Sequence, residues 1–254
     1  RTGARILPDA DGVYTLNAAC PYTYSITCYG YVSQQATFTA GQARISVTLQ
    51  KAPARSYTEL LQDGDWAQFR ANAENNAITS APTPIAAEEA VLNWANKLGD
   101  GLSGGGVGSP IIVGGAIYTY ANDTVMKVDR RTGALLASAP MDHASSFSIT
   151  PPAYGEGMIF VGLSGGGIQA FDAETLRSLW LYEDPLGGQP NCPITYRDGY
   201  LYTGFWNAET RKANFVCLSV TDEDPAQEKE QKIAAWSHTG NGFYWAGAYV
   251  AENY

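Results

Sequence analysis

One short pattern recurs along the chain at nearly constant spacing, and it restricts the fold more than any other feature of the sequence. Each copy has a proline, a short run rich in strand-forming residues, a glycine and a second such run with an aromatic residue. The copies lie at residues 109–118, 150–160 and 192–202, and residues 246–250 open a fourth. Pro110, Pro151 and Pro193 are 41 and 42 residues apart. A period near 42 with several short strands per unit is typical of the blades of a β-propeller.

Each blade is expected to contain four antiparallel strands that run outward from a central channel. The expected strands are 107–113, 116–120, 125–129 and 135–139 in the first unit, 147–154, 158–162, 168–172 and 178–182 in the second, and 191–196, 200–205, 215–219 and 233–237 in the third. Gly115, Gly157 and Gly199 stand between the first two strands. We expect them to supply the positive φ of a tight hairpin.

Residues 12–50 show a different pattern, a period-two alternation interrupted by glycine and proline. Tyr22, Tyr24 and Ile26 share one face of an expected strand, Phe38 lies in another, and residues 45–49 form a further one. Such alternation predicts antiparallel strands with one buried face. We therefore divide the chain into a β-sandwich-like module at 1–54, a linker at 55–65 and propeller blades at 66–254. Residues 56–61 could form a short helix or belong to the linker.

Composition agrees with an all-β protein and excludes several partners. The 254 residues are 45% hydrophobic and include 16 tyrosines and 27 glycines, which favours sheets and provides enough apolar surface for two domains. The net charge of −9 would repel nucleic acid and anionic membranes. No run approaches the ~20 apolar residues of a membrane span.

The four cysteines leave two alternatives open. Cys20 and Cys28 lie in the N-terminal segment, Cys192 and Cys217 lie in the repeats, and none forms a C-x-x-C pair. With two histidines in the chain, a zinc site is not expected. All four could be buried thiols, or Cys20 and Cys28 could form a disulfide, which would indicate an oxidising compartment.

One turn can be interpreted residue by residue. Asp129, Thr132 and Gly133 follow the third strand of the first unit, and Asp172, Thr175 and Leu176 occupy the same positions in the second. The Asp and Thr side chains can accept hydrogen bonds from turn amides, and glycine fits a left-handed position. Leucine in the glycine position predicts that the second turn differs in shape or is strained.

This turn, together with Trp180, resembles the tryptophan-docking motif of the PQQ-like (quinoprotein-type) β-propeller repeat family. In that family the outer-strand tryptophan packs between neighbouring blades. Ala137 occupies the tryptophan position of the first unit, while Trp94 and Trp236 are placed in the outer strands of the flanking units. The segment from Trp66 is similar to the lead-in before the first blade of secreted members. The resemblance covers residues 66–254.

The N-terminal segment is similar to a carboxypeptidase-regulatory or PEGA-like β-sandwich module of bacterial surface proteins. The similarity rests on residues 22–26, 30–31 and 45–49. It implies a spacer or adhesive module without catalysis.

The blade count does not close a ring. Residues 66–254 provide about four blades, typical propellers have four to eight, and the resemblance implies seven or eight. An outer strand near 91–96 precedes the first unit. We therefore expect a partial ring, either a fragment or one that self-association with a second copy completes.

Two groups of residues are candidates for a site. Phe205, Trp206, Tyr244 and Trp245 are aromatic residues at hairpin tips or on the channel strand, and they could form a ligand platform or pack between blades. His143 and His238 lie in equivalent loops two blades apart. They could form a catalytic or metal pair, although we expect two loop histidines. The acidic insertion at 222–230 is expected to be solvated.

We expect no catalytic residue, cofactor or metal ligand in this chain. Quinone binding in the related dehydrogenases implies adjacent cysteines, a calcium constellation and a catalytic Asp, and the sequence shows no placement for them. The first hypothesis is a non-catalytic extracellular or cell-surface bacterial protein whose propeller binds protein or glycan. The alternatives are a piece of a PQQ-dependent dehydrogenase and a scaffold of the outer-membrane assembly type.

Overall fold

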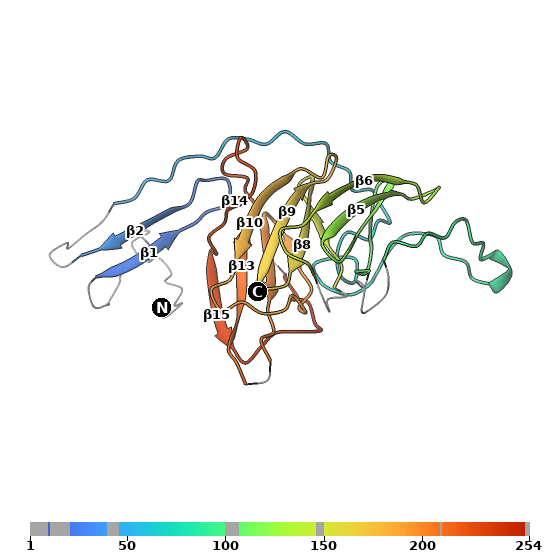
Figure 1. Ribbon diagram of the computed structural model, residues 1–254. Coiled ribbons are helices and arrows are strands. Elements are labelled where there is room, and N and C mark those ends of the chain that lie inside the picture. The colour runs from blue at the N-terminus through green and yellow to red at the C-terminus, as the bar shows by residue number, and fades with distance from the viewer. Residues whose placement is uncertain are drawn as a thin grey trace.

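The computed structural model describes residues 10, 21–39, 46–99, 107–145, 150–208 and 210–251. Within these ranges the chain is all-β apart from one 3-10 helix, η1 Ala87–Glu89. Three separate sheets stand side by side, and a two-stranded hairpin projects from them (Figure 1). The prediction of an all-β, incompletely closed propeller is confirmed.

Each blade is an antiparallel sheet in simple chain order. Blade one contains β3 Ile111–Val113, β4 Ala116–Ala121, β5 Thr124–Asp129 and β6 Leu135–Pro140; blade two contains β7 Ala153–Gly155, β8 Met158–Leu163, β9 Gly167–Asp172 and β10 Ser178–Glu183; blade three contains β11 Thr195–Arg197, β12 Tyr200–Gly204, β13 Ala213–Ser219 and β15 Trp236–Gly240. The inner strands are shorter than expected. Pro110, Pro151 and Pro193 precede them, and a proline has no N–H to donate to a sheet.

The hairpins between the first two strands differ slightly from the expectation. Glu156 and Gly157 both have positive φ, as do Asp198 and Gly199, which is the pattern of a type I′ turn. In blade one the positive φ belongs to Gly114 and not to Gly115. The tight turn is therefore present in each blade, but the glycine we assigned in the first was wrong by one position.

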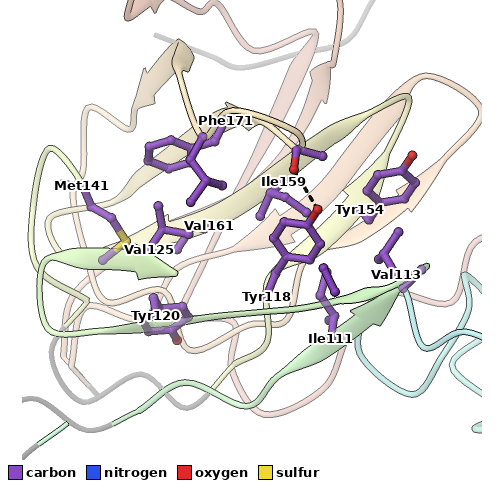
Figure 2. Close-up of a cluster of buried hydrophobic side chains, with 14 of the residues drawn as sticks. Ile111, Val113, Tyr118, Tyr120, Val125, Met141, Tyr154, Ile159, Val161 and Phe171 are labelled. Carbon is purple, nitrogen blue, oxygen red and sulfur yellow. Dashed lines mark hydrogen bonds between the residues drawn. The ribbon is translucent and has the colours of Figure 1, made fainter. Parts of the chain in front are cut away.

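Both faces of the middle blade are buried against its neighbours. All six residues of β8 are buried, so the strand shows no apolar–polar alternation. Ile159 and Val161 pack toward blade one, against Tyr118 and Val125 (Figure 2). Phe160 belongs to the cluster shared with blade three. Successive side chains on a strand point to opposite faces, so one strand contributes to two inter-blade cores.

The N-terminal segment contains an antiparallel hairpin, β1 Tyr22–Ile26 and β2 Gln34–Phe38. Tyr22, Tyr24 and Ile26 share its half-buried face, as predicted. Residues 46–50 form no strand, in contrast to our expectation, and the next contact is the single bridge from Tyr31 to Lys51. Residues 11–20 and 40–45 lie outside the described ranges, so the sandwich stays a prediction.

One further expectation is wrong, because residues 91–96 are not a strand. Of the two alternatives left open for residues 56–61, the short helix is absent. An outer strand needs a neighbouring strand to supply its backbone hydrogen bonds, and within the described ranges no strand pairs with residues 91–96.

The acidic insertion is not simply solvated, as we had expected. Its end forms β14 Glu230–Gln231, which adds a parallel fifth strand to the edge of β10. Asp222, Glu230 and Lys232 are buried there. Lys232 neutralises the neighbouring acids, which allows charged side chains to leave water.

Cys192 and Cys217 are buried thiols, but Cys28 is exposed, so the alternative of four buried thiols is wrong for Cys28. Burial raises the pKa of the Cys192 thiol to about 11, which keeps it protonated and unreactive. Cys20 lies outside the described ranges, so its pairing with Cys28 stays a prediction. Within those ranges, we also find no helical segment with the length and apolar character of a membrane span.

Candidate functional site

The turns between the third and fourth strands have the hydrogen bonds that the sequence predicts. Asp129 Oδ1 accepts from the amides of Arg131 at 3.0 Å and Thr132 at 2.7 Å, and from Thr132 Oγ1 at 2.8 Å. Asp172 Oδ1 accepts the equivalent three bonds at 3.0, 2.9 and 2.9 Å. The bonds from the Thr132 side chain and amide hold the pKa of Asp129 below its usual value.

Leu176 keeps the same backbone shape as Gly133 in spite of its side chain. Its φ is 58°, close to the 72° of Gly133, so the second turn is strained and not rebuilt. The reason lies in the side chain that packs on each turn. Trp94 packs so closely on Gly133 that a Cβ there would lie 2.5 Å from its ring. At the next junction Ala137 leaves that space empty, and the buried Leu176 fills it.

Each of these junctions also provides a donor for one turn carbonyl. Trp94 Nε1 donates to Arg130 O at 3.1 Å, and Trp180 Nε1 donates to Val220 O at 3.2 Å. Between them, where the tryptophan is missing, Ala173 O accepts from Tyr118 Oη at 2.7 Å (the dashed line in Figure 2). It also accepts from Lys127 Nζ at 3.0 Å. Tyr118 and Lys127 therefore donate to the turn carbonyl at the junction that has no docking tryptophan.

The pair Ala137 and Leu176 stands where the flanking junction has a tryptophan and a glycine. We therefore expect the effects of substitutions at positions 137 and 176 on stability to be strongly coupled. Ala137→Trp alone should overpack the junction, and Leu176→Gly alone should leave a cavity, each destabilising by about 1–3 kcal/mol. The two substitutions together rebuild the arrangement of Trp94 on Gly133. We therefore expect the stability loss of the double variant to be smaller than the sum of the two single losses by at least about 1 kcal/mol. Urea unfolding of the four proteins measures this, and simple additivity would contradict it.

Residues 66–68 cover the inner strands on their channel side. Trp66 and Ile112 exchange two backbone hydrogen bonds, and Ala67 O accepts from Tyr154 N at 2.8 Å. Gln68 exchanges two bonds with the backbone of Tyr196. Three successive residues thus contact blades one, two and three in order, because the inner strands converge on the axis.

The described residues do not fit the calcium and quinone site of the related dehydrogenases. No group of three or more His, Cys, Asp or Glu side chains that could hold a metal ion is found among them. The channel side of the three inner strands is occupied by residues 66–68. The expectation that this chain binds no cofactor stays a prediction.

One rim of the blades is covered by a strap, which we define as the described residues 29–33 and 46–65. The Tyr29 ring packs on Gly199 of blade three and the Tyr57 ring on Gly157 of blade two, where a Cβ would lie 2.4 and 2.7 Å away. A Cβ on Gly114 of blade one would likewise lie 2.8 Å from Leu60 O. The strap therefore contacts the same hairpin in each blade and runs from the third to the first (Figure 1).

Polar contacts fix the strap along its length. Arg55 forms an ion pair with Asp172 at 3.2 Å and donates to Gly157 O at 2.7 Å. Ser33 donates its amide and its hydroxyl to the two carboxylate oxygens of Glu223, at 2.7 and 2.8 Å. The Tyr29 hydroxyl donates to Glu156, and burial raises its pKa to about 12. Residues 55–65, expected to be a linker, are thus fixed to the blades.

The opposite rim presents aromatic side chains. Turns between strands two and three, and the connections between blades, lie at this end because the strands alternate in direction. Trp206, from the β12–β13 hairpin, lies 6.2 Å from Tyr244, which lies 6.1 Å from Trp245 at an interplanar angle of 89°. Trp245 is 63% exposed and has a left-handed φ of 67°. These three residues form what we call the aromatic platform.

The other candidates do not join the platform. Phe205 is completely buried between blades two and three, so the alternative of inter-blade packing applies to it. His238 is exposed on β15 beside the Phe243 ring. His143 lies near Asp142 and Glu183, with Nε2 at 3.8 and 3.9 Å from their oxygens. The structure places the two histidines with different neighbours, and His238 lies in β15 and not in a loop, in contrast to our expectation.

Sequence analysis missed Gln189 and Asn191, which support the platform. Gln189 exchanges backbone hydrogen bonds with Trp206, and Asn191 O accepts from Trp245 N at 2.9 Å. Both belong to the connection between blades two and three. Nothing local in the sequence marks them, because their neighbours come from loops up to 54 residues later.

The separate four-stranded sheets, the docked tryptophans and the Asp-Thr turns are features of PQQ-like β-propeller repeats. Residues 83–206 match the family model described as outer membrane protein assembly factor BamB. No curated protein matches the chain. The match falls on blades one and two and the first half of blade three, where the repeat is most regular.

Two solved structures confirm the fold. A europium-containing methanol dehydrogenase is 18% identical with a TM-score of 0.53, covering 69% of this chain and 32% of its own. Quinohemoprotein alcohol dehydrogenase from Comamonas testosteroni is 19% identical with a TM-score of 0.52, covering 69% of this chain and 27% of its own. This chain spans less than a third of the length of either protein.

Proposed function

We propose that this chain is a non-catalytic binding or scaffold protein that acts outside the bacterial cytoplasm, at the cell surface or beyond it. The observation that carries the proposal is the difference between the two rims. The strap fills the rim of the inner hairpin turns with its own contacts. On the opposite rim, Tyr244 and Trp245 of the aromatic platform are exposed on a connecting loop. Loops on a rigid frame are where propellers bind their partners.

The family match supports a related alternative. Because the matching model is described as an outer membrane assembly factor, the ligand could be another protein of the cell envelope, and the chain an assembly scaffold. A dehydrogenase is supported by fold alone. We therefore rank protein or glycan binding first, assembly second and quinone-dependent oxidation third. A second copy that completes the ring would be compatible with the first two.

Site-specific photocrosslinking tests the proposal. A benzophenone amino acid is placed at Trp206 or Tyr244 on the open rim. The matched control position is Tyr57 of the strap, which is as exposed as Tyr244. We expect envelope-dependent crosslinks from the first two positions that excess unlabelled protein suppresses, and none from Tyr57. Equal crosslinking from all positions, or none from the open rim, would count against the proposal. Dye reduction with an alcohol, PQQ and calcium tests the enzymatic alternative, and we expect none.

A further inference from the structure

The connection that leaves β15 begins with Asn241 and Gly242, which form the only Asn-Gly pair in the 254 residues. β15 ends at Gly240, so the pair lies outside the sheet, and Asn241 is exposed. Gly242 has a φ of 126°, in a region that residues with a side chain rarely adopt. Because glycine has no Cβ, no side chain of its own shields the Gly242 nitrogen from the neighbouring Asn241 side chain.

The backbone amide of Gly242 differs from that of the residue after it. Phe243 N donates to Phe205 O at 2.9 Å. Within the described part of the chain, Gly242 N donates to no backbone carbonyl. Gly242 N can therefore approach the Asn241 side chain as a nucleophile without the cost of breaking a backbone hydrogen bond.

A cation lies on the carbonyl oxygen of the Asn241 side chain. Lys212 Nζ, at the end of the hairpin between β12 and β13, donates to Asn241 Oδ1 at 2.6 Å. The ammonium group withdraws electron density from Cγ of Asn241. It also stabilises the negative charge that Oδ1 gains when a nucleophile adds to Cγ. The nucleophile and the electrostatic stabilisation thus meet at one side chain.

We propose that Asn241 deamidates spontaneously and that Lys212 assists the reaction. Gly242 N gives its proton to solvent base and forms a bond to Cγ of Asn241. The bond from Cγ to Nδ2 breaks, and Nδ2 leaves as ammonia after taking up a proton from solvent. Water then opens one of the two carbonyls of the five-membered imide, which gives aspartate or isoaspartate at this position. One water is consumed and one ammonia released, so the reaction requires no oxidant or reductant.

The two products affect the aromatic platform differently. Aspartate leaves the main chain unchanged, and its new charge forms a charge-assisted hydrogen bond with Lys212. Isoaspartate adds a methylene to the main chain before Phe243, whose ring lies 5.4 Å from the Phe215 ring. The chain that leads to Tyr244 therefore lengthens in the isoaspartate form alone. This inference goes beyond the proposed binding role and does not depend on it.

Peptide mapping by mass spectrometry tests the proposal on the folded protein, incubated in mildly alkaline buffer made with heavy-oxygen water. We expect conversion at Asn241 with one heavy oxygen atom incorporated. It should be at least about tenfold faster than at Asn93 and Asn122, two exposed asparagines of the same protein. These are followed by Trp94 and Asp123, whose side chains hinder the approach of the backbone nitrogen.

Two variants test the part of Lys212. Lys212→Met should slow the conversion of Asn241 about threefold or more, and Lys212→Arg, which keeps the cation, should restore it. Near-UV circular dichroism confirms that each variant is folded. Conversion of Asn241 that is no faster than that of Asn93 and Asn122 would overturn the proposal. A rate that Lys212→Met leaves unchanged would overturn the assisting role of Lys212.

Discussion

Replacing Trp180 by alanine is expected to lower the free energy of unfolding by about 3–5 kcal/mol. Trp180 is completely buried between blades two and three. It packs on Phe160, donates to Val220 O and lies under the Lys232 ammonium group, 5.7 Å from Nζ. Its removal leaves a cavity and an unpaired carbonyl.

Urea unfolding followed by circular dichroism measures this loss. Trp180→Phe retains most of the packing but not the indole N–H, so it should cost clearly less than the alanine variant. Trp245→Ala is the surface control and should change stability by less than about 0.5 kcal/mol. If the loss for Trp180→Ala were as small as for the control, the docking of tryptophan between blades would not stabilise this protein.

Replacing Lys232 by methionine is expected to cost about 3–5 kcal/mol at neutral pH, because it leaves two carboxylates without their cation. The Lys232 side chain is 2% exposed, with Nζ 3.0 Å from Glu223 Oε1 and 3.3 Å from Glu230 Oε1. It also donates to Thr221 O. Methionine keeps roughly the length of the side chain but removes the charge and the N–H donor to Thr221 O.

The deficit of this variant should shrink in acid. Burial raises the pKa of Glu230 above its usual value, and Lys232 partly offsets this. A carboxyl with a raised folded-state pKa stabilises the protein below its unfolded pKa and loses that contribution as the pH rises through the folded pKa. Without Lys232 the folded pKa rises further, so the variant should lose most at about pH 7.5 and recover toward about pH 5.

Lys229→Met is the matched control in the same insertion. Lys229 is half exposed and pairs with Asp142 at 2.6 Å, so its loss should change stability by less than about 1 kcal/mol at either pH. An equal effect of both lysine variants, or a Lys232→Met deficit that does not depend on pH, would contradict the role assigned to the buried cluster.

The aromatic platform illustrates how much of a site the sequence could predict. Trp206, Tyr244 and Trp245 were identified as aromatic residues at hairpin tips, and they do meet. Phe205, adjacent to Trp206, points into the core, because neighbouring residues on an extended chain face opposite sides. The partial exposure of Trp206 and the burial of Phe205 depend on which blade face each side chain meets.

The sequence by itself determined the blade period, the tight hairpins and the Asp-Thr turns. These depend on contacts within a few residues, so proline, glycine and short polar side chains are sufficient to specify them. Only the tertiary structure decided that Leu176 keeps a left-handed backbone and that Tyr118 and Lys127 replace a missing tryptophan. It also decided that the strap contacts the blades in the order three, two, one. Each of these is set by side chains of another blade or of the distant N-terminal segment, and no local pattern encodes such a neighbour.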